Sequence, residues 1–254
     1  MGLLQKLGIL GAPLPGRGIP APGVRPVPGR IPPVGGGAGH AMMNSPRSAK
    51  AAESSRTSNG LKEFLWNLDG LGHGKLLDLG PAWQTTLSFF IERGFRVSSE
   101  DLLRAWKEFL QSEEQNLQMA LGGSVEALDM TAEGRAARFL AGNLRYSPAW
   151  FDAILLWDVL DYLEPIVARR VVEQLTELLR PGGVVLAMFH SRRPEQFHRY
   201  RVADSMTLQM LPGTEGFQSQ RIYQNREIQE LFRVYRTMKS FVGRDQLREV
   251  LFIK

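Results

Sequence analysis

The sequence has no cysteine and few histidines. None of its 254 residues is cysteine, which excludes disulfides, thiolate metal ligands and a cysteine nucleophile. The four histidines are His40, His73, His190 and His198, and they show no metal-ligand spacing such as H-E-x-x-H. The sequence therefore predicts no metal site, and a cytoplasmic protein is the default expectation.

A long hydrophobic run is also lacking. The opening stretch, Met1 to Leu10, carries one positive charge, and glycine and proline soon interrupt its short apolar run. This pattern is too weak for a secretory signal or a membrane span, although an amphipathic anchor over Leu3 to Leu10 is a minor alternative. We expect no membrane-spanning segment.

Residues 1–60 lack aromatic side chains and hold 9 of the 15 prolines and 12 of the 26 glycines. Such a segment cannot bury enough apolar surface to offset the entropy lost on ordering. We therefore predict a disordered, basic tail over residues 1–60 and one folded domain over residues 61–254. The tail carries a net charge of +6 and the remainder −1, so nucleic-acid binding is not indicated.

A buried strand followed by a tight turn is the first clear feature of the predicted domain. The segment Lys75 to Leu79 reads K-L-L-D-L, and Gly80 and Pro81 end it. A helical pattern follows over residues 85–93, and Gly94 stands where a helix would stop. This order of strand, turn and helix is half of a βαβ unit, in which ligands bind beyond the carboxyl end of the strand.

Further strands and helices follow in alternation. Phe95 to Ser99 reads as a second strand, Leu102 to about Leu121 as a long helix, and residues 122–141 as a short helix before or around a third strand.

The second half of the chain continues this alternation. Phe151 to Trp157 is an apolar run typical of a central strand buried on both faces, and Val167 to Leu179 is an amphipathic helix. The Pro-Gly-Gly at 181–183 ends that helix before a strand over Val184 to Phe189. Two apolar runs around 243–245 predict an antiparallel hairpin at the end.

Three of these segments carry a family resemblance. K-L-L-D-L-G-P-A-W at 75–83, F-D-A-I-L-L-W-D-V-L-D-Y-L at 151–163 and L-R-P-G-G at 179–183 resemble the class I methyltransferases that use S-adenosylmethionine, of the type 11/12 kind. The resemblance covers about residues 60–254. It implies an α/β fold with a Rossmann-like doubly wound sheet, mostly parallel with an antiparallel last strand, in the order 3-2-1-4-5-7-6.

The resemblance implies S-adenosylmethionine as the cofactor and places residues around it. Asp78 and Gly80 match the first motif, whereas Ala82 and Gln84 replace its second and third glycines, which let backbone approach the ligand. Ala82 is the milder change, because Gln84 beside Trp83 would partly fill the space of the methionine part.

Acidic and amide side chains stand where the family contacts adenosine. Glu100 and Asp101 follow the second strand, and residue counting favours Asp101 as the acceptor for the ribose hydroxyls. Asn143 stands in for the residue that contacts the adenine amino group, and Trp157 lines the substrate side. The alternatives are a helix cap for Asp101, a turn residue for Asn143 and a core position for Trp157.

The methyl acceptor is a small molecule or a protein that the sequence does not identify. His190, at the end of the Val184 strand, is the best placed general base, although a lone histidine there is often structural. Residues 190–221 are expected to form the acceptor side or its lid, where arginines with His198 and Tyr200 suit a carboxylate or phosphate. A solvated insertion is the alternative.

Two functions of different classes follow from these patterns. The first is an S-adenosylmethionine-dependent methyltransferase. The second, suggested by Ala82 and Gln84, is a non-catalytic protein of the same fold that serves as a binding or assembly module. A Rossmann-type dehydrogenase is a weaker third, because its G-x-G-x-x-G turn is absent.

Overall fold

The computed structural model describes residues 54–120, 129, 131–243 and 245–254. Most of the predicted tail therefore lies outside the described residues. Its expected boundary at residue 60 does not hold, because strand β1 (Ser54–Thr57) and helix α1 (Asn59–Leu68) both begin earlier. Ser58 caps α1, with its hydroxyl accepting from the Leu61 N–H at 2.9 Å.

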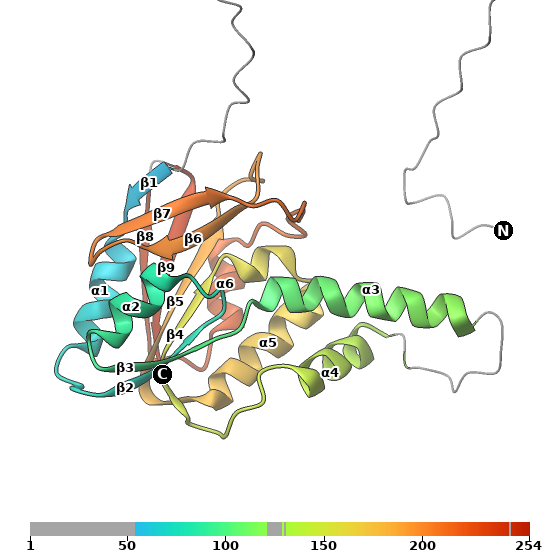
Figure 1. Cartoon of the computed structure of the whole chain (residues 1–254), viewed down its shortest axis with the longest axis horizontal. Helices are drawn as coiled ribbons and strands as arrows, with labels where there is room; N and C mark the ends of the chain where they lie inside the picture. Colours follow the sequence, from blue (N-terminus) through green and yellow to red (C-terminus); the bar gives the residue numbers. More distant parts are fainter. Residues whose placement is uncertain (1–53, 121–128, 130, 244) are drawn as a thin grey trace, which may run out of the picture. The chain divides into compact units, whose positions relative to one another are not determined.

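A mixed six-stranded sheet forms the centre of the fold (Figure 1). Its strands, in spatial order, are β3 (Phe95–Ser99), β2 (Gly74–Asp78), β4 (Phe151–Trp157), β5 (Leu179–His190), β9 (Leu247–Ile253) and β8 (Thr237–Val242). The first four are parallel, and β9 runs antiparallel to both of its neighbours. This arrangement confirms the predicted Rossmann-like sheet and the terminal hairpin.

The predicted order differs from this sheet by one strand. Counted as predicted, the observed order is 2-1-4-5-7-6, and the third strand is absent from the described residues. Helix α3 (Leu102–Ala120) is followed instead by α4 (Ala132–Gly142), while residues 121–128 and 130 lie outside the described part. Glu113 of α3 is buried and pairs with Arg135 of α4 at 2.7 Å, so an ion pair joins the two helices.

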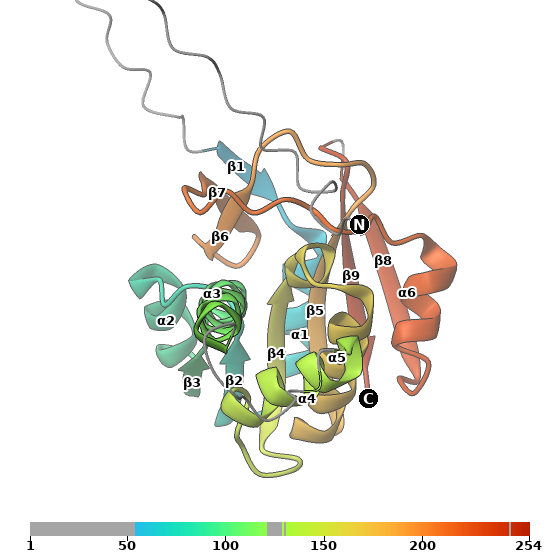
Figure 2. The ribbon, with the colours of Figure 1, turned by 90° about the vertical axis from the view of Figure 1, so that its right-hand side faces the viewer.

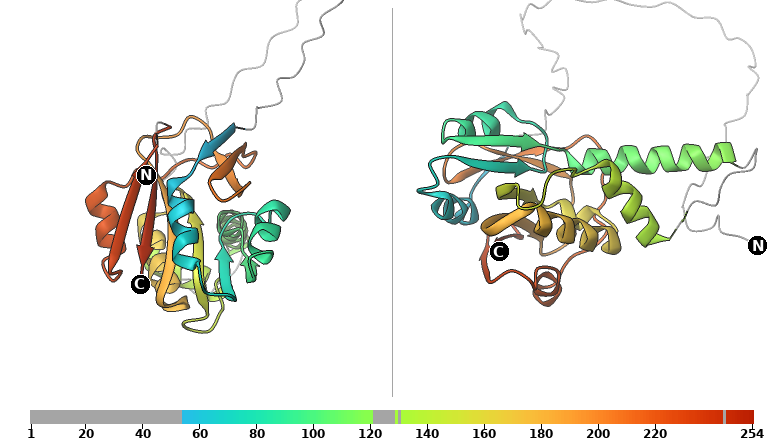
Figure 3. Two further views of the ribbon diagram at one scale, coloured as in Figure 1. Left: turned by 90° about the vertical axis from the view of Figure 1, so that its left-hand side faces the viewer. Right: turned by 90° about the horizontal axis from the view of Figure 1, so that it is seen from below.

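Helices cover both faces of the sheet (Figure 3). On one face, α1 and α2 (Gln84–Ile91) pack their Phe64 and Phe90 rings edge to face, 6.3 Å apart. On the other face lie α3, α4, α5 (Pro165–Leu178) and α6 (Asn225–Leu231). Strand β4 serves both layers, because Leu155 packs in the first and Ile154 in the second. No helix within the described ranges is long and apolar enough to cross a membrane.

A second, three-stranded sheet lies across the carboxyl ends of the parallel strands (Figure 2). It pairs β1 with β7 (Thr207–Pro212) and β7 with β6 (His198–Val202), all antiparallel. Strand β6 contacts α2 through the Val202 N–H, which donates to the Thr86 hydroxyl at 3.0 Å. Within the segment 190–221, residues 198–212 therefore form a hairpin that is held against the domain.

Candidate functional site

Asp78 lies at the carboxyl end of β2, where the sequence predicts a ligand site. Its side chain is buried, and its Oδ1 accepts from the Gly80 N–H at 3.0 Å and from Trp157 Nε1 at 2.7 Å. Burial raises the pKa of Asp78 to about 6, against the opposing effect of these two hydrogen bonds. Both donors belong to the chain itself, so the structure uses this carboxylate to hold the turn and Trp157 together.

Trp157 ends β4 and fills the space beside this turn. Its side chain is 4% exposed, and its backbone has a φ of 53°, in the left-handed region that disfavours bulky residues. A Cβ placed on Gly80 would lie 2.8 Å from Trp157 Nε1, so the indole packs directly on the glycine. On its other side the indole stacks on Tyr200 of β6, with ring centroids 5.8 Å apart and planes at 10°.

Three of the sequence-predicted cofactor residues line one hollow at the end of β3. This β3 hollow has a volume of about 380 Å³ and is lined by Glu100, Asp101, Asn143 and the half-buried Tyr146, among others. Glu100 Oε2 accepts from the Leu144 N–H at 3.2 Å, which ties the end of β3 to the segment after α4. The β3 hollow therefore joins residues that lie more than 40 positions apart.

Asp101 has two partners within the chain. Its Oδ1 accepts from the Arg104 N–H at 3.2 Å, the capping contact that the sequence left as an alternative. The same oxygen accepts from Arg199 of β6 at 2.8 Å, and Arg199 also pairs with Glu215 at 2.9 Å. Sequence reasoning gave no partner for Arg199, whose guanidinium is buried between the two carboxylates.

Asn143 and Ala82 differ in their positions. Asn143 follows the last turn of α4, and its Nδ2 donates to the Phe139 carbonyl at 2.8 Å. Its amide oxygen is therefore the atom left for a ligand in the β3 hollow. Ala82 is exposed on the turn before α2 and does not line this hollow.

His190 belongs to a separate cluster at the end of β5. Its Nδ1 lies 3.0 Å from Asp161 Oδ2 and 3.8 Å from Asp158 Oδ2, and its N–H donates to Asp161 Oδ2 at 2.7 Å. Both acids are buried, and Tyr200 donates its hydroxyl to Asp158 Oδ2 at 3.2 Å. Sequence reasoning gave Asp161 no role, although the D-x-x-D spacing directly after a buried strand was a usable signal.

Burial sets the protonation of this cluster. It raises the pKa of Asp158 to about 7 and also raises the pKa of Asp161, against the attraction of His190. For His190, burial opposes the charged form, but the Asp161 hydrogen bond and the Asp158 charge raise its pKa overall. The protonation of each of the three groups therefore affects that of the other two.

A second hollow, of about 290 Å³, opens beside this cluster. We call it the His190 hollow, and its lining includes His190, Arg192, Arg193, His198, Tyr200 and Met210. Tyr200 contributes to its wall and also stacks on Trp157. The stacked rings of Tyr200 and Trp157 thus lie between the His190 hollow and the β2 turn.

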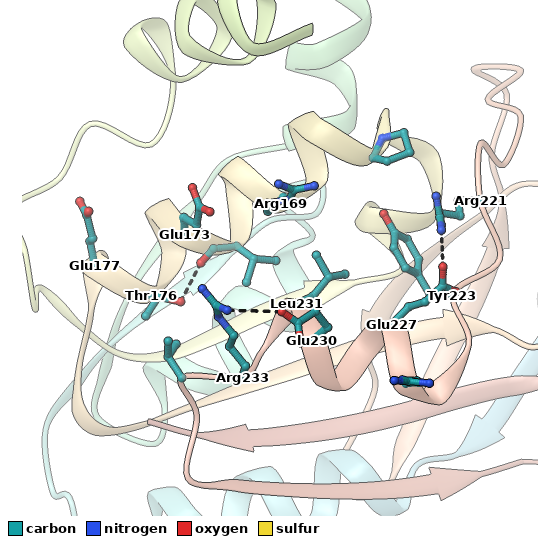
Figure 4. Close-up of a pocket in the computed structure, with 14 residues that line it drawn as sticks. Arg169, Glu173, Thr176, Glu177, Arg221, Tyr223, Glu227, Glu230, Leu231 and Arg233 are labelled. Atoms are coloured by element: carbon teal, nitrogen blue, oxygen red, sulfur yellow. Dashed lines mark hydrogen bonds and ion pairs between the residues drawn. The ribbon is translucent and has the colours of Figure 1, made fainter.

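A larger groove, of about 970 Å³, lies between α5 and α6 (Figure 4). Its lining residues include two ion pairs, Arg233 with Glu230 at 3.4 Å and Arg221 with Glu227. It contains none of the sequence-predicted site residues. We therefore place the candidate site at the strand ends and not in this groove.

No protein-family model matches the chain, and no curated protein matches it. Among solved structures, the chain is similar to a 1,6-didemethyltoxoflavin-N1-methyltransferase from Burkholderia thailandensis with bound S-adenosylhomocysteine, at 16% identity over 76% of this chain and 75% of that one, with a TM-score of 0.40.

Two further solved structures are similar. One is a putative S-adenosylmethionine-dependent methyltransferase from Listeria monocytogenes, at 13% identity over 77% of this chain and 97% of that one, with a TM-score of 0.43. The other is an S-adenosylmethionine-dependent methyltransferase from Methanosarcina mazei, at 15% identity over 72% and 93%, with a TM-score of 0.39. At these identities and scores, function has to be argued from the side chains.

Proposed function

We propose that this protein is a methyltransferase that binds S-adenosylmethionine and acts on a small-molecule or protein acceptor. The observation that carries the proposal is the β3 hollow. Glu100, Asp101 and Asn143 are the residues that the family resemblance associates with adenosine, and they line one hollow at the carboxyl end of a parallel strand. Ligands of open parallel sheets bind at this edge.

The lining of the β3 hollow suits a nucleoside. Carboxylate oxygens accept hydrogen bonds from ribose hydroxyls, and the Asn143 amide oxygen can accept from an adenine amino group. Tyr146 adds an aromatic side chain at the same hollow, where a base could stack. When bound, S-adenosylmethionine supplies a methyl group on a positively charged sulfur, and the role of these residues is to hold and orient its nucleoside end.

The β2 turn does not fit the methionine part of this cofactor while Trp157 stays in place. The indole packs on Gly80 and takes the hydrogen bond of Asp78, so the backbone of the turn is covered. Binding of the whole cofactor therefore requires the indole to leave Gly80.

The same observation favours a second candidate function. If Trp157 is a permanent part of the core, the chain keeps a nucleoside-binding hollow without a place for the transferred methyl group. The protein would then be the non-catalytic member of the fold, serving as a binding or assembly module.

Calorimetric titration separates the two functions. We would titrate the full chain with S-adenosylmethionine, S-adenosylhomocysteine and adenosine, and repeat each titration with Asp101→Asn and with Glu108→Gln. The second variant is the matched control, because Glu108 lies on the same helix but is largely exposed and lines no part of the β3 hollow. Circular dichroism would show that each variant is folded.

If the protein is a methyltransferase, we expect it to bind S-adenosylmethionine with micromolar affinity, and more tightly than it binds adenosine. Loss of a charge-assisted hydrogen bond should weaken it about tenfold or more in Asp101→Asn and leave Glu108→Gln unchanged. Adenosine binding equal to that of S-adenosylmethionine would support the non-catalytic module. Absence of binding for all three ligands at millimolar concentration would overturn both.

A further inference from the structure

Arg199 is a buried arginine that divides its guanidinium between two carboxylates. Its Nε and Nη2 both donate to Glu215 Oε1, at 3.2 Å and 2.9 Å, and its Nη1 donates to Asp101 Oδ1 at 2.8 Å. The guanidinium carbon lies 5.0 Å from the centre of the Phe197 ring and 5.7 Å from that of the Phe217 ring. Two ion pairs and two aromatic rings therefore restrict the guanidinium to one orientation.

Glu215 is itself anchored, and so it sets the direction of the Arg199 guanidinium. It follows β7, and its backbone carbonyl accepts from Lys107 Nζ of α3 at 2.9 Å. The contact with Glu215 occupies two of the three guanidinium nitrogens, and the third donates to Asp101. Since Arg199 belongs to β6, it connects the small sheet to the start of α3.

Asp101 is held through only one of its two carboxylate oxygens. Its Oδ1 accepts from Arg199 and from the Arg104 N–H, whereas Oδ2 has no hydrogen-bond partner among the described residues. The Asp101 side chain is 19% exposed and lines the β3 hollow, so a ligand there has access to it. Two donors on Oδ1 restrict the rotation of the carboxylate, and Oδ2 is the oxygen left for a ligand.

We propose that Arg199 is a positioning residue for nucleoside binding, which fixes the Asp101 carboxylate so that its Oδ2 accepts from the ribose hydroxyls of a ligand in the β3 hollow. The inference rests on the proposed function, because that function places a nucleoside in this hollow. Arg199 does not line the hollow and acts through Asp101 alone. Without Arg199 the carboxylate is free to turn and lies near the unpaired charge of Glu215, so the ribose contact is lost.

The charges at the β3 hollow suit an uncharged ribose. Glu100, Asp101 and Arg145 all line the hollow. Ribose hydroxyl groups are neutral donors, so the two carboxylates attract them. Asp101 also remains a strong acceptor, because Arg199 gives it one hydrogen bond and directs its other two at Glu215.

The test compares two ligands that differ only in the ribose hydroxyls. Adenosine carries both hydroxyls, and 2′,3′-dideoxyadenosine carries neither. Calorimetry on the full chain gives the ratio of the two affinities for the wild type, Asp101→Asn, Arg199→Met and the milder Arg199→Lys. A merely structural role of Arg199 would weaken the binding of both ligands alike and leave this ratio unchanged. Circular dichroism shows which variants are folded under the conditions of the titration.

We expect the wild type to prefer adenosine about tenfold or more, and Asp101→Asn and Arg199→Met to lose most of this preference. Combining these two substitutions should cause no further loss, because both act on one contact. Arg199→Lys keeps the positive charge but lacks the planar fork, so its preference should be intermediate. Gly60→Ala is the control for lowered stability and should keep the wild-type ratio, since Gly60 lies against Glu249 and lines no part of the hollow.

A preference for adenosine that the folded Arg199 variants retain in full would overturn the inference and leave the proposed function intact. Equal binding of the two nucleosides by the wild type would also overturn it, because Asp101 would then make no ribose contact, although the hollow would still bind a nucleoside. Absence of binding for both ligands at millimolar concentration would overturn the inference together with the proposed function.

Discussion

Trp157 Nε1 donates a hydrogen bond to Asp78 Oδ1 across 2.7 Å, and so joins the ends of two neighbouring parallel strands, β4 and β2. The bond lies at the edge of the sheet where this architecture usually places a ligand. The buried Asp78 carboxylate thus has two donors from the chain itself, the indole and the Gly80 N–H. Whether the indole can leave decides between the two proposed functions.

Trp157→Ala should open the β2 turn and weaken the fold. Removing a buried tryptophan costs about 3 to 5 kcal/mol in the free energy of unfolding. The same change should increase the affinity for S-adenosylmethionine relative to that for adenosine. Urea denaturation and calorimetry measure the two effects. Trp157→Phe is the control, because it keeps a ring on Gly80 and removes only the donor to Asp78.

Acidification from about pH 8 to about pH 5 should stabilise the protein. The pKa values of Asp78 and Asp158 are about 6 and about 7 in the folded state, above the ordinary value of 3.8. The folded state therefore binds more protons than the unfolded state between these values, and stability falls as pH rises through this window, on the order of a few kcal/mol. The raised pKa of His190 acts in the same direction, whereas burial lowers the pKa of His198 and opposes part of the gain within this window.

Urea midpoints measured across this range test the prediction. Among the described residues, four carboxyl groups have lowered pKa values: Asp129, Asp204, Glu215 and Glu227. They lose their stabilising contribution only at pH values below about 4.5, outside this window. Asp78→Asn should flatten the lower part of the profile and Asp158→Asn the upper part. A midpoint that falls steadily on acidification to about pH 5 would show that these acids are not buried as described.

Arg199→Met should destabilise the protein by about 2 to 3 kcal/mol, less than for a fully buried pair because Asp101 and Glu215 are partly exposed. The change leaves both carboxylates without their shared partner. Chemical denaturation of this variant measures the loss. Arg170→Met is the control, since Arg170 forms ion pairs of similar length but is half exposed, and little effect is expected there.

Gly60→Ala should lower the free energy of unfolding by about 1 to 3 kcal/mol, because the added methyl group disturbs the packing of α1 on the sheet. An added Cβ would lie 2.6 Å from Glu249 Oε2 and 2.9 Å from a methyl carbon of Leu186. The Gly60 N–H also donates to that carboxylate at 2.5 Å, so the helix cannot move away without losing the bond. Thermal unfolding measures the shift, and Gly142→Ala, with open space around its Cβ position, is the matched control.

The large sheet was predictable because its strands carry strong local signals. The apolar run Phe151 to Trp157, for example, forms β4 as predicted. The prediction that Pro-Gly-Gly at 181–183 ends α5 was wrong, because α5 ends at Leu178 and these residues lie inside β5, where its register with β4 shifts. The small sheet was not predictable. Strand β1 reads S-S-R-T, without alternation or apolar residues, and it pairs with β7, about 150 positions later in the chain.

The candidate site was predictable to the level of residue type. Asp78 ends β2, Glu100 and Asp101 follow β3, and His190 ends β5, so these residues lie at the strand ends where the sequence places them. The direction of the Trp157 indole was not accessible, because it follows from a left-handed backbone and from Tyr200 on another sheet. The ion pair between Arg199 and Asp101 likewise joins two segments that only the tertiary fold brings together.

Pairing between β1 and β7 has a consequence for how the chain assembles. During synthesis β1 leaves the ribosome before every other described element, yet its Ser54 faces Met210 in the finished structure. Contacts between residues so distant in sequence form late, because the loop between them has to be closed first. The small sheet that covers the strand ends is therefore completed only after β2 to β5 exist, so the nascent domain passes through a stage in which its ligand edge is open to solvent.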